Sequence, residues 1–417
     1  MPHQPSASPI WQMIAETKKL PQMEEGGAAL TLVFPVAATA VDFFTSSGSP
    51  FGSFGAGAYA QRDAAPIMQL AALSGLWGIT FVISWFASLS NHIWEHGFRL
   101  SRPALLVACV IALVPGLGAA RVWLAPEAAQ TAQIAGFSLP EGKLSAMLAQ
   151  LQSGDQVGFR QAVDSLHAQE LAQIRTLAQR GAQIVVLQEG AGLGYTDQVA
   201  QLLTDAAAVA KAEQIYIVLP TIAVGEPQTA NVVRIIDPSG AVVLEHVKYG
   251  GTQFEGSVTG DGILRTVDTP YGRLSAVICW DADFPDIIRQ AGQQGVDVLF
   301  VPANDWPAVK DIHAGMAAFR AVENGLAIYR QAGQGVSLVT DSYGRTVKRI
   351  DLFAEGGTAD FAATQSTATP IGSVQTLYPQ IGDLVGYLMQ IGTLGLLGGL
   401  GVMRARRLSK RDVALAS

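Results

Sequence analysis

The chain has 417 residues, enough for one large domain with additional elements or for two ordinary domains. Only 15% of the residues are charged, the formal net charge is −7 and the mean hydropathy is +0.28. This composition differs from that of an average soluble protein, and an acidic chain with no basic run in its central part is not expected to bind nucleic acid.

Apolar residues are concentrated in stretches that flank a more polar central region. Three stretches carry no charge, namely Pro66–Ser90, Pro103–Ala120 and Leu384–Met403. Each is close to the ~20 residues that a helix needs to cross ~30 Å of hydrocarbon. A weaker stretch, Gly27–Phe44, is closed by Asp42. We therefore predict four membrane spans, at about residues 27–44, 66–90, 103–120 and 384–403. Buried helices of a soluble core are the alternative, above all for the first stretch.

Basic residues beside these stretches predict the orientation, because cytoplasmic loops are enriched in lysine and arginine. With four spans, the flanking basic residues all fall on one side: Lys18, Lys19, Arg99, Arg102, Arg404, Arg406, Arg407, Lys410 and Arg411. This side should be the cytoplasm. The segment from about Arg121 to Ile381 then faces outward, and residues 404–417 form a basic cytoplasmic tail.

The central region alternates between strand and helix patterns. Buried strands are expected at VVLQEG, IYIVLPTIA, SAVICWD and VDVLFVPAND. Three further pairs of extended runs are joined by DPSG, TPYG and DSYG, which are typical of hairpins. Helical periodicity covers Phe159–Arg180, Thr196–Glu213 and the segments PDIIRQAGQQG and DIHAGMAAFRAVENG. Mixed sheets with helices packed outside them are therefore expected over residues 126–363, after an N-terminal membrane region of residues 1–125. The polar residues 364–383 are expected to form a linker to the last span.

Three reactive residues each end a predicted strand: Glu189, Lys248 and Cys279. If these strand ends meet at one edge of a sheet, the carboxylate can deprotonate the thiol and the ammonium can stabilise an oxyanion. On spacing alone, a plain buried cysteine and two solvated strand ends are the more common explanation. Cys109 lies in a predicted span, so it is not expected to pair with Cys279.

The motifs VVLQEG, EHVKYG, AVICWDADFP and VLFVPANDW, in this order and at these intervals, resemble the nitrilase or carbon–nitrogen hydrolase superfamily. The resemblance covers about 250 residues. It implies an α/β fold, an αββα sandwich, here inserted between transmembrane helices. It also implies that Glu189 is the general base, Lys248 the oxyanion stabiliser and Cys279 the nucleophile. Glu255 matches an auxiliary glutamate that family members often carry beyond the lysine.

The membrane segments LVFPVAATAVDFF and QLAALSGLWGITFVISWF resemble one branch of the superfamily, the apolipoprotein N-acyltransferases. That resemblance implies a bacterial cytoplasmic membrane enzyme whose catalytic domain faces the periplasm. It implies a phospholipid acyl donor, a lipoprotein or other amine acceptor, and no cofactor or metal. The chain departs from the branch in having four predicted spans rather than about eight. It also has LQE where the branch has WPE, and YGGTQFEG where the branch has an HLVPFGE-like sequence.

Two residues beside the nucleophile match positions where the branch carries an aromatic residue and a carboxylate. By this match Trp280 and Asp281 are expected at the substrate, although Asp281 can instead orient a neighbouring donor, and Asp283 is expected only to start the following helix. A membrane-tethered amidase with the same triad remains an alternative, as does an inactive scaffold. A metal site is not expected, because the histidines lack paired spacing and His313 fits a helix position.

Overall fold

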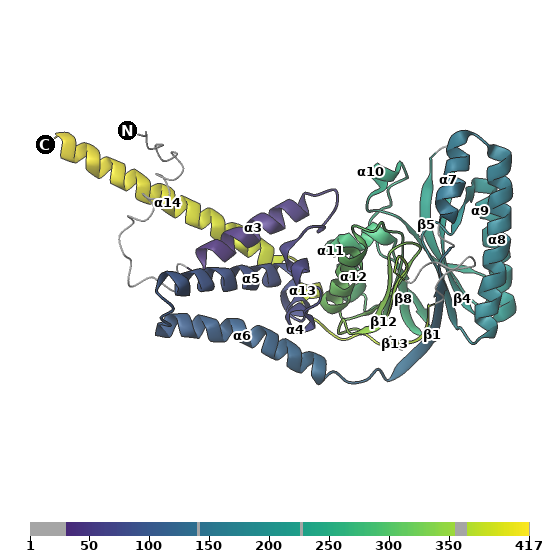
Figure 1. Ribbon diagram of the computed structural model, residues 1–417, viewed down its shortest axis with the longest axis horizontal. Helices are drawn as coiled ribbons and strands as arrows, with labels where there is room; N and C mark the ends of the chain where they lie inside the picture. Colours follow the sequence, from purple (N-terminus) through teal and green to yellow (C-terminus); the bar gives the residue numbers. More distant parts are fainter. Residues whose placement is uncertain (1–30, 140–141, 226–227, 355–364, 417) are drawn as a thin grey trace, which may run out of the picture.

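The computed structural model describes residues 31–139, 142–225, 228–354 and 365–416. Two β-sheets stack face to face, and helices cover the outer face of each sheet (Figure 1). The two inner faces bury a shared apolar core that includes Ile134, Val186, Phe300 and Tyr329. The predicted αββα sandwich is therefore confirmed.

The first sheet has the order β13-β1-β2-β4-β5-β6, with β3 paired to β4. Its strands are β1 (Gln130–Phe137), β2 (Ile184–Leu187), β3 (Gly192–Tyr195), β4 (Tyr216–Val224), β5 (Ala230–Ile236), β6 (Val242–Val247) and β13 (Gln365–Ile371). Its helices are α7 (Lys143–Ser153), α8 (Gln156–Gln179) and α9 (Thr196–Glu213). Helix α8 begins where Asp155 accepts a hydrogen bond from Gly158 N–H. The strand β2, with the sequence IVVL, is buried on both faces, as its unbroken apolar run predicts.

The second sheet has the order β12-β11-β10-β9-β8-β7. Its strands are β7 (Val267–Thr269), β8 (Gly272–Ala276), β9 (Val298–Ala303), β10 (Ala327–Ala332), β11 (Val336–Thr340) and β12 (Thr346–Asp351). Helices α11 (Pro285–Gln293) and α12 (Lys310–Asn324) cover its outer face. The three predicted hairpins are confirmed as the antiparallel pairs β5–β6, β7–β8 and β11–β12.

The predicted linker at residues 364–383 is wrong over part of its length. Residues Gln365–Ile371 form β13, which pairs antiparallel with β1 at the edge of the first sheet. The side chains of this strand are mostly polar, so they carry no apolar strand pattern. Backbone hydrogen bonds to β1 form the strand instead. The sandwich therefore extends to Ile371, and the short helix α13 (Tyr378–Ile381) follows it.

Helices that precede and follow the sandwich lie together on one side of it (Figure 1). They are α3 (Val33–Ser47), the 3₁₀ turn η1 (Gly57–Gln61), α4 (Ala65–Met68), α5 (Ala71–Glu95), α6 (Arg102–Trp123) and α14 (Leu384–Ala416). Within the described residues, α5, α6 and α14 are long and apolar enough to cross a membrane. Helix α3 has 15 residues, fewer than a span needs, and residues 27–30 of the first predicted span lie outside the described residues.

Helix α12 joins the two parts of the molecule. One face of this helix packs on the second sheet through Ala317 and Ala321. Another face packs through Met316 and Phe319 against residues of α5 and η1, among them Tyr59. The apolar helices are thus docked directly on the sandwich.

Candidate active site

The structure brings Glu189, Lys248 and Cys279 to one end of the sandwich. Glu189 lies two residues after β2, and Lys248 directly follows β6. Lys248 Nζ donates to Glu189 Oε1 at 2.7 Å, and both side chains are buried. Cys279 lies close enough to both groups for their charges to act on its thiol.

Lys248 is held between two carboxylates. Its ammonium also contacts the carboxylate of Glu255, which ends the short helix α10 (Thr252–Glu255). Burial alone would lower the pKa of Lys248, but the charges of Glu189, Cys279 and Glu255 outweigh it and raise the pKa. The ammonium therefore stays charged, as an oxyanion stabiliser requires.

Asn231 is a site residue that the sequence analysis did not find. This residue of β5 donates from Nδ2 to Glu189 Oε1 at 2.9 Å. Glu189 Oε1 thus accepts from both Asn231 and Lys248, which fixes the carboxylate in place. No motif marks Asn231, because it lies inside an apolar strand in the middle of the chain.

We predicted that Cys279 ends a strand, and this is wrong, because Cys279 begins a turn. Strand β8 ends at Ala276, and Cys279–Asp283 form a 3₁₀ turn, here called the catalytic turn. The backbone of Cys279 has a φ of +47°, a region that residues other than glycine rarely adopt. Its Sγ lies 3.8 Å from the carbonyl oxygen of Asn304. Burial raises the pKa of the Cys279 thiol well above its usual value, and the charge of Glu189 adds to this effect.

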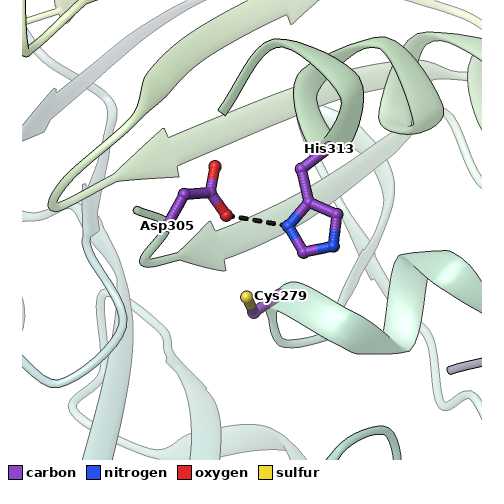
Figure 2. Close-up of side chains that lie close together, drawn as sticks. All are labelled: Cys279, Asp305 and His313. Atoms are coloured by element: carbon purple, nitrogen blue, oxygen red, sulfur yellow. Dashed lines mark hydrogen bonds and ion pairs between the residues drawn. The ribbon is translucent and has the colours of Figure 1, made fainter. Parts of the chain in front are cut away.

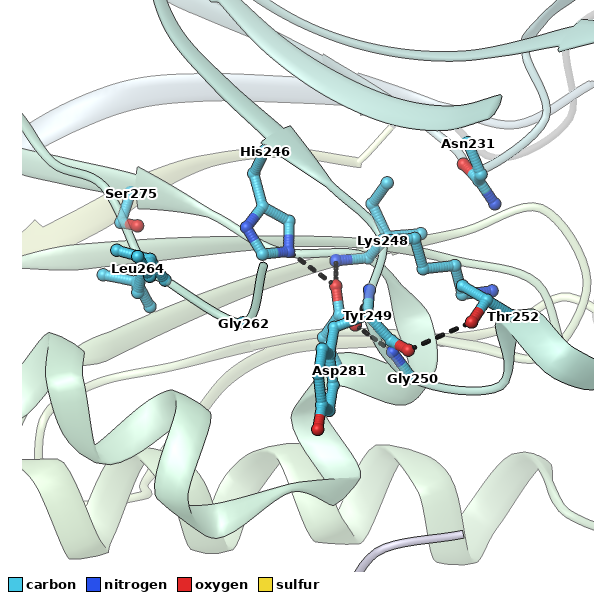
Figure 3. Close-up of polar contacts among 12 residues, drawn as sticks. Asn231, His246, Lys248, Tyr249, Gly250, Thr252, Gly262, Leu264, Ser275 and Asp281 are labelled. Carbon is cyan, nitrogen blue, oxygen red and sulfur yellow. Dashed lines mark hydrogen bonds and ion pairs between the residues drawn. The ribbon is translucent and has the colours of Figure 1, made fainter. Parts of the chain in front are cut away.

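The structure buries Asp281 among protein donors. This arrangement favours the alternative in which Asp281 orients a neighbouring donor over contact with substrate. Its side chain is 0% exposed. Its carboxylate accepts from the backbone N–H groups of Tyr249 and Gly250 and bonds to His246 Nε2 (Figure 3). It also accepts from the backbone N–H of Ile278. A short acid beside a turn satisfies orphan N–H groups more readily than it faces solvent. Asp281 instead ties the catalytic turn to the loop after Lys248.

Asp283 does more than start a helix. The carboxylate is buried and contacts His313 Nε2 at 2.9 Å, while His313 Nδ1 contacts Asp305 at 2.8 Å. Asp305 also accepts from Arg330 at 2.7 Å. Burial would lower the pKa of His313, but the two carboxylates raise it to about 9. Arg330 and His313 likewise outweigh burial at Asp305 and lower its pKa.

Cys279, Asp305 and His313 lie close together, with one potential ligand atom of each within 4.8 Å of the others (Figure 2). A histidine binds a metal through a ring nitrogen that carries no proton. Both ring nitrogens of His313 are engaged by carboxylates and its pKa is raised, so both carry protons at neutral pH. The chemistry of this cluster therefore does not fit a metal ion.

Trp280 belongs to an aromatic cluster beside the triad. Its ring meets those of Phe51 and Phe254 edge to face, at centroid distances of 5.8 and 6.0 Å, and the two phenylalanine rings stack at 4.9 Å. Lys248 Nζ lies 6.0 Å from the centre of the Trp280 ring. Both phenylalanines are exposed. An exposed apolar surface thus borders Lys248.

A buried thiol beside a fixed carboxylate and a charged lysine is an arrangement suited to acyl chemistry through a cysteine nucleophile. The sequence model described as "Carbon-nitrogen hydrolase" matches residues 146–371, more than half of the chain. The chain belongs to this family, and it is an enzyme of the carbon–nitrogen hydrolase superfamily.

The chain is similar to proteins named apolipoprotein N-acyltransferase. The one from Bradyrhizobium diazoefficiens is 26% identical, over 88% of this chain and 71% of that protein. The one from Geobacter metallireducens is 22% identical, over 88% of this chain and 74% of that protein. Among solved structures, an amidase from Nesterenkonia sp. aligns with 60% of this chain and 93% of its own, at 18% identity and a TM-score of 0.43.

Proposed function

We propose that the protein is a membrane-bound acyltransferase that moves a fatty acyl chain from a phospholipid to the N-terminal amine of a lipoprotein. The similarity to proteins named apolipoprotein N-acyltransferase carries this proposal, because it covers 88% of the chain. That share is larger than the family match at residues 146–371, so the similarity reaches into the apolar helices as well. A catalytic domain attached to such helices suits two lipid substrates.

In the first step, Cys279 Sγ attacks the ester carbonyl of the phospholipid while Glu189 takes the thiol proton. Glu189 Oε1 already accepts from Lys248 and Asn231, so Oε2 is the oxygen available for this proton. The charged Lys248 and the backbone N–H of Trp280 stabilise the oxyanion. The C–O bond then breaks, the lysophospholipid leaves with the proton from Glu189, and a thioester remains.

In the second step, the amine of the acceptor attacks the thioester carbonyl. Glu189 takes one proton from the amine, the C–S bond breaks, and the thiolate of Cys279 recovers its proton. The products are an amide and the free enzyme. Glu255 supports both steps through a second contact with the ammonium of Lys248, besides that of Glu189.

The aromatic cluster is the proposed contact for the acyl chain. Phe51 and Phe254 expose apolar rings next to Trp280, which directly follows the nucleophile. Transferring a chain onto such a surface removes apolar area from water, worth roughly 25 cal/mol per Å². This surface also limits the access of water to the thioester.

We further propose that the protein resides in a bacterial cytoplasmic membrane with its sandwich on the outer, periplasmic side. The basic residues that flank the spans support this orientation. The lipoprotein amine is presented on that side. The triad needs no cofactor for the two proposed steps.

The test uses vesicles of phospholipid with an isotopically labelled acyl chain, followed by a peptide bearing an N-terminal diacylglyceryl-cysteine. We expect a labelled thioester that persists until the peptide is added and then appears as an amide on the peptide. Release of labelled free fatty acid at the same rate with and without peptide would instead identify a membrane-tethered hydrolase. No labelled enzyme at all, with full cleavage of a simple amide, would overturn the lipid donor.

A further inference from the structure

One loop of the membrane region contacts the catalytic turn and the adjoining helix α12 with four consecutive residues. This loop, Phe51–Phe54, connects α3 to η1 and is here called the docking loop. Phe51 lies against Trp280, and the ring of Phe54 meets that of His313 edge to face at 5.8 Å. The two residues between them, Gly52 and Ser53, contact the backbone of the turn itself.

Ser53 holds the last carbonyl of the catalytic turn. The backbone N–H and the hydroxyl of Ser53 both donate to the carbonyl oxygen of Asp283, each at 2.7 Å. The carboxylate of Asp283 is held separately by His313. Asp283 is thus fixed at its backbone by the membrane region and at its side chain by α12.

Gly52 lets the two backbones approach this closely. Its φ is +57°, and a Cβ added there would lie 2.4 Å from the carbonyl oxygen of Asp283. Because the obstructing atom is backbone, a side chain at this position would have to displace the turn. Gly55, in the same segment, also has a positive φ, of +91°, but a Cβ there would meet nothing within 4 Å.

Buried hydrogen bonds continue from the docking loop into the sandwich. Ser53 Oγ and the hydroxyl of Tyr59 are 2.6 Å apart, and Arg320 of α12 donates to Tyr59 at 3.1 Å. Arg320 in turn bonds to Glu323 at 3.0 Å. All four side chains are buried, so the loop is held against the sandwich by contacts that solvent does not weaken.

The catalytic turn contains an unfavourable backbone conformation that contacts from the docking loop can stabilise. The φ of Cys279 is +47°, and a residue other than glycine keeps such a backbone only where the surrounding structure holds it. Backbone contacts from the docking loop act on the opposite end of the same five-residue turn. A shift at Asp283 is therefore passed to Cys279 over a short and rigid path.

We propose that Gly52 and Ser53 are positioning residues for the nucleophile, so that the membrane region sets the reactivity of Cys279 as well as anchoring the enzyme. The inference rests on the proposed role of Cys279 as nucleophile. It does not depend on which acyl donor or acceptor the enzyme uses.

The test compares Gly52→Ala and Ser53→Ala with the wild type in the full chain, in detergent. The first readout is the rate at which iodoacetamide alkylates Cys279 between pH 6 and pH 9, followed by peptide mass spectrometry, which separates Cys279 from Cys109. The second is acyl transfer from phospholipid vesicles. Gly55→Ala controls for a positive φ without close contact. Ser90→Ala controls for a hydroxyl that bonds only within its own helix, to Phe86 O at 2.8 Å.

We expect both loop variants to slow alkylation of Cys279 by about tenfold, which corresponds to ~1.4 kcal/mol. We also expect them to shift the pH profile of alkylation. Acyl transfer should lose kcat with little change in KM. Both controls should stay within about twofold of the wild type, since ~0.4 kcal/mol is the size of ordinary surface effects.

Wild-type alkylation rates and pH profiles in Gly52→Ala and Ser53→Ala would overturn the proposal. If Gly52→Ala does not fold, as judged by its melting temperature, Ser53→Ala decides alone, because it keeps the backbone bond to Asp283. If the wild type alkylates at Cys279 but transfers no acyl group, the proposed function fails while the alkylation rates still decide this inference.

Discussion

Lys248 is the residue whose surroundings most restrict its role. The ammonium lies between Glu189 and Glu255 and is buried, so its position is fixed before any substrate binds. A fixed, charged donor gains most of its value where charge develops in the transition state. It contributes less to ground-state binding of an uncharged ester.

We predict that Lys248→Met lowers kcat by about 10²–10³ with a much smaller change in KM. Steady-state kinetics of acyl transfer measure both values. Lys211→Met, on the exposed face of α9, is the control for loss of a lysine and should match the wild type. A loss confined to KM would make Lys248 a substrate-binding residue.

The raised pKa of His313 predicts that the stability of the fold depends on pH. Its pKa rises from an ordinary 6.5 to about 9 between Asp283 and Asp305. A raised pKa in the folded state stabilises the fold fully below pH 6.5, and this contribution is lost as the pH rises through about 9.

We therefore predict that the melting temperature of the wild type falls between pH 6.5 and 9, and that His313→Gln removes most of this fall. The difference between the two proteins should be largest at pH 6 and smallest above pH 9. Thermal unfolding across this range measures it. A gap that widens toward high pH would contradict the assignment of a protonated His313.

At the scale of elements, Asp281 connects two loops that come from different sheets. Its carboxylate accepts from Tyr249 and Gly250 after β6 and from Ile278 after β8. These bonds place Lys248 and Cys279 relative to each other. The buried carboxylate of Asp281 therefore contributes to the site through these backbone contacts.

We predict that Asp281→Asn destabilises the protein by about 1–3 kcal/mol, because an amide group would face backbone N–H donors left without an acceptor. Melting temperature and the alkylation rate of Cys279 should both fall. Asp286→Asn, an exposed position in the first turn of α11, is the control. Reduced transfer with an unchanged melting temperature would instead indicate that Asp281 contacts the substrate.

Sequence patterns predicted the elements whose own residues carry a strand or helix pattern. Glu189 and Lys248 each follow a strand that the pattern predicts, and the helix Thr196–Glu213 has the predicted bounds. Three features had no such signal. Strand β13 is polar and depends on backbone pairing with β1. The burial of Asp281 depends on a loop 31–32 residues away, and Ser53 meets Asp283 across 230 residues.

At the scale of the whole molecule, the apolar helices and the sandwich form one continuous structure. Helix α12 packs on both parts, and Trp77 of α5 donates to Asp383 just before α14 at 2.7 Å. The membrane orientation of this assembly therefore fixes the side on which the active site works.

We predict that the sandwich lies outside the cytoplasm and the C-terminus inside. A reporter fused after Thr376 follows the last strand and leaves the sandwich complete, and a second fusion follows Ser417. The first should be active only in an extracytoplasmic assay and the second only in a cytoplasmic one. Reversed signals would undo both the orientation and the lipoprotein acceptor.

The central claim is that Cys279 carries the acyl group. Peptide mass spectrometry of the wild-type enzyme, after incubation with phospholipid vesicles and no amine acceptor, tests it most directly. The account predicts an adduct with the mass of a long acyl chain on Cys279, released by neutral hydroxylamine and missing from Cys279→Ser. An unmodified Cys279 while the enzyme still consumes phospholipid, or an adduct on another residue, would contradict it.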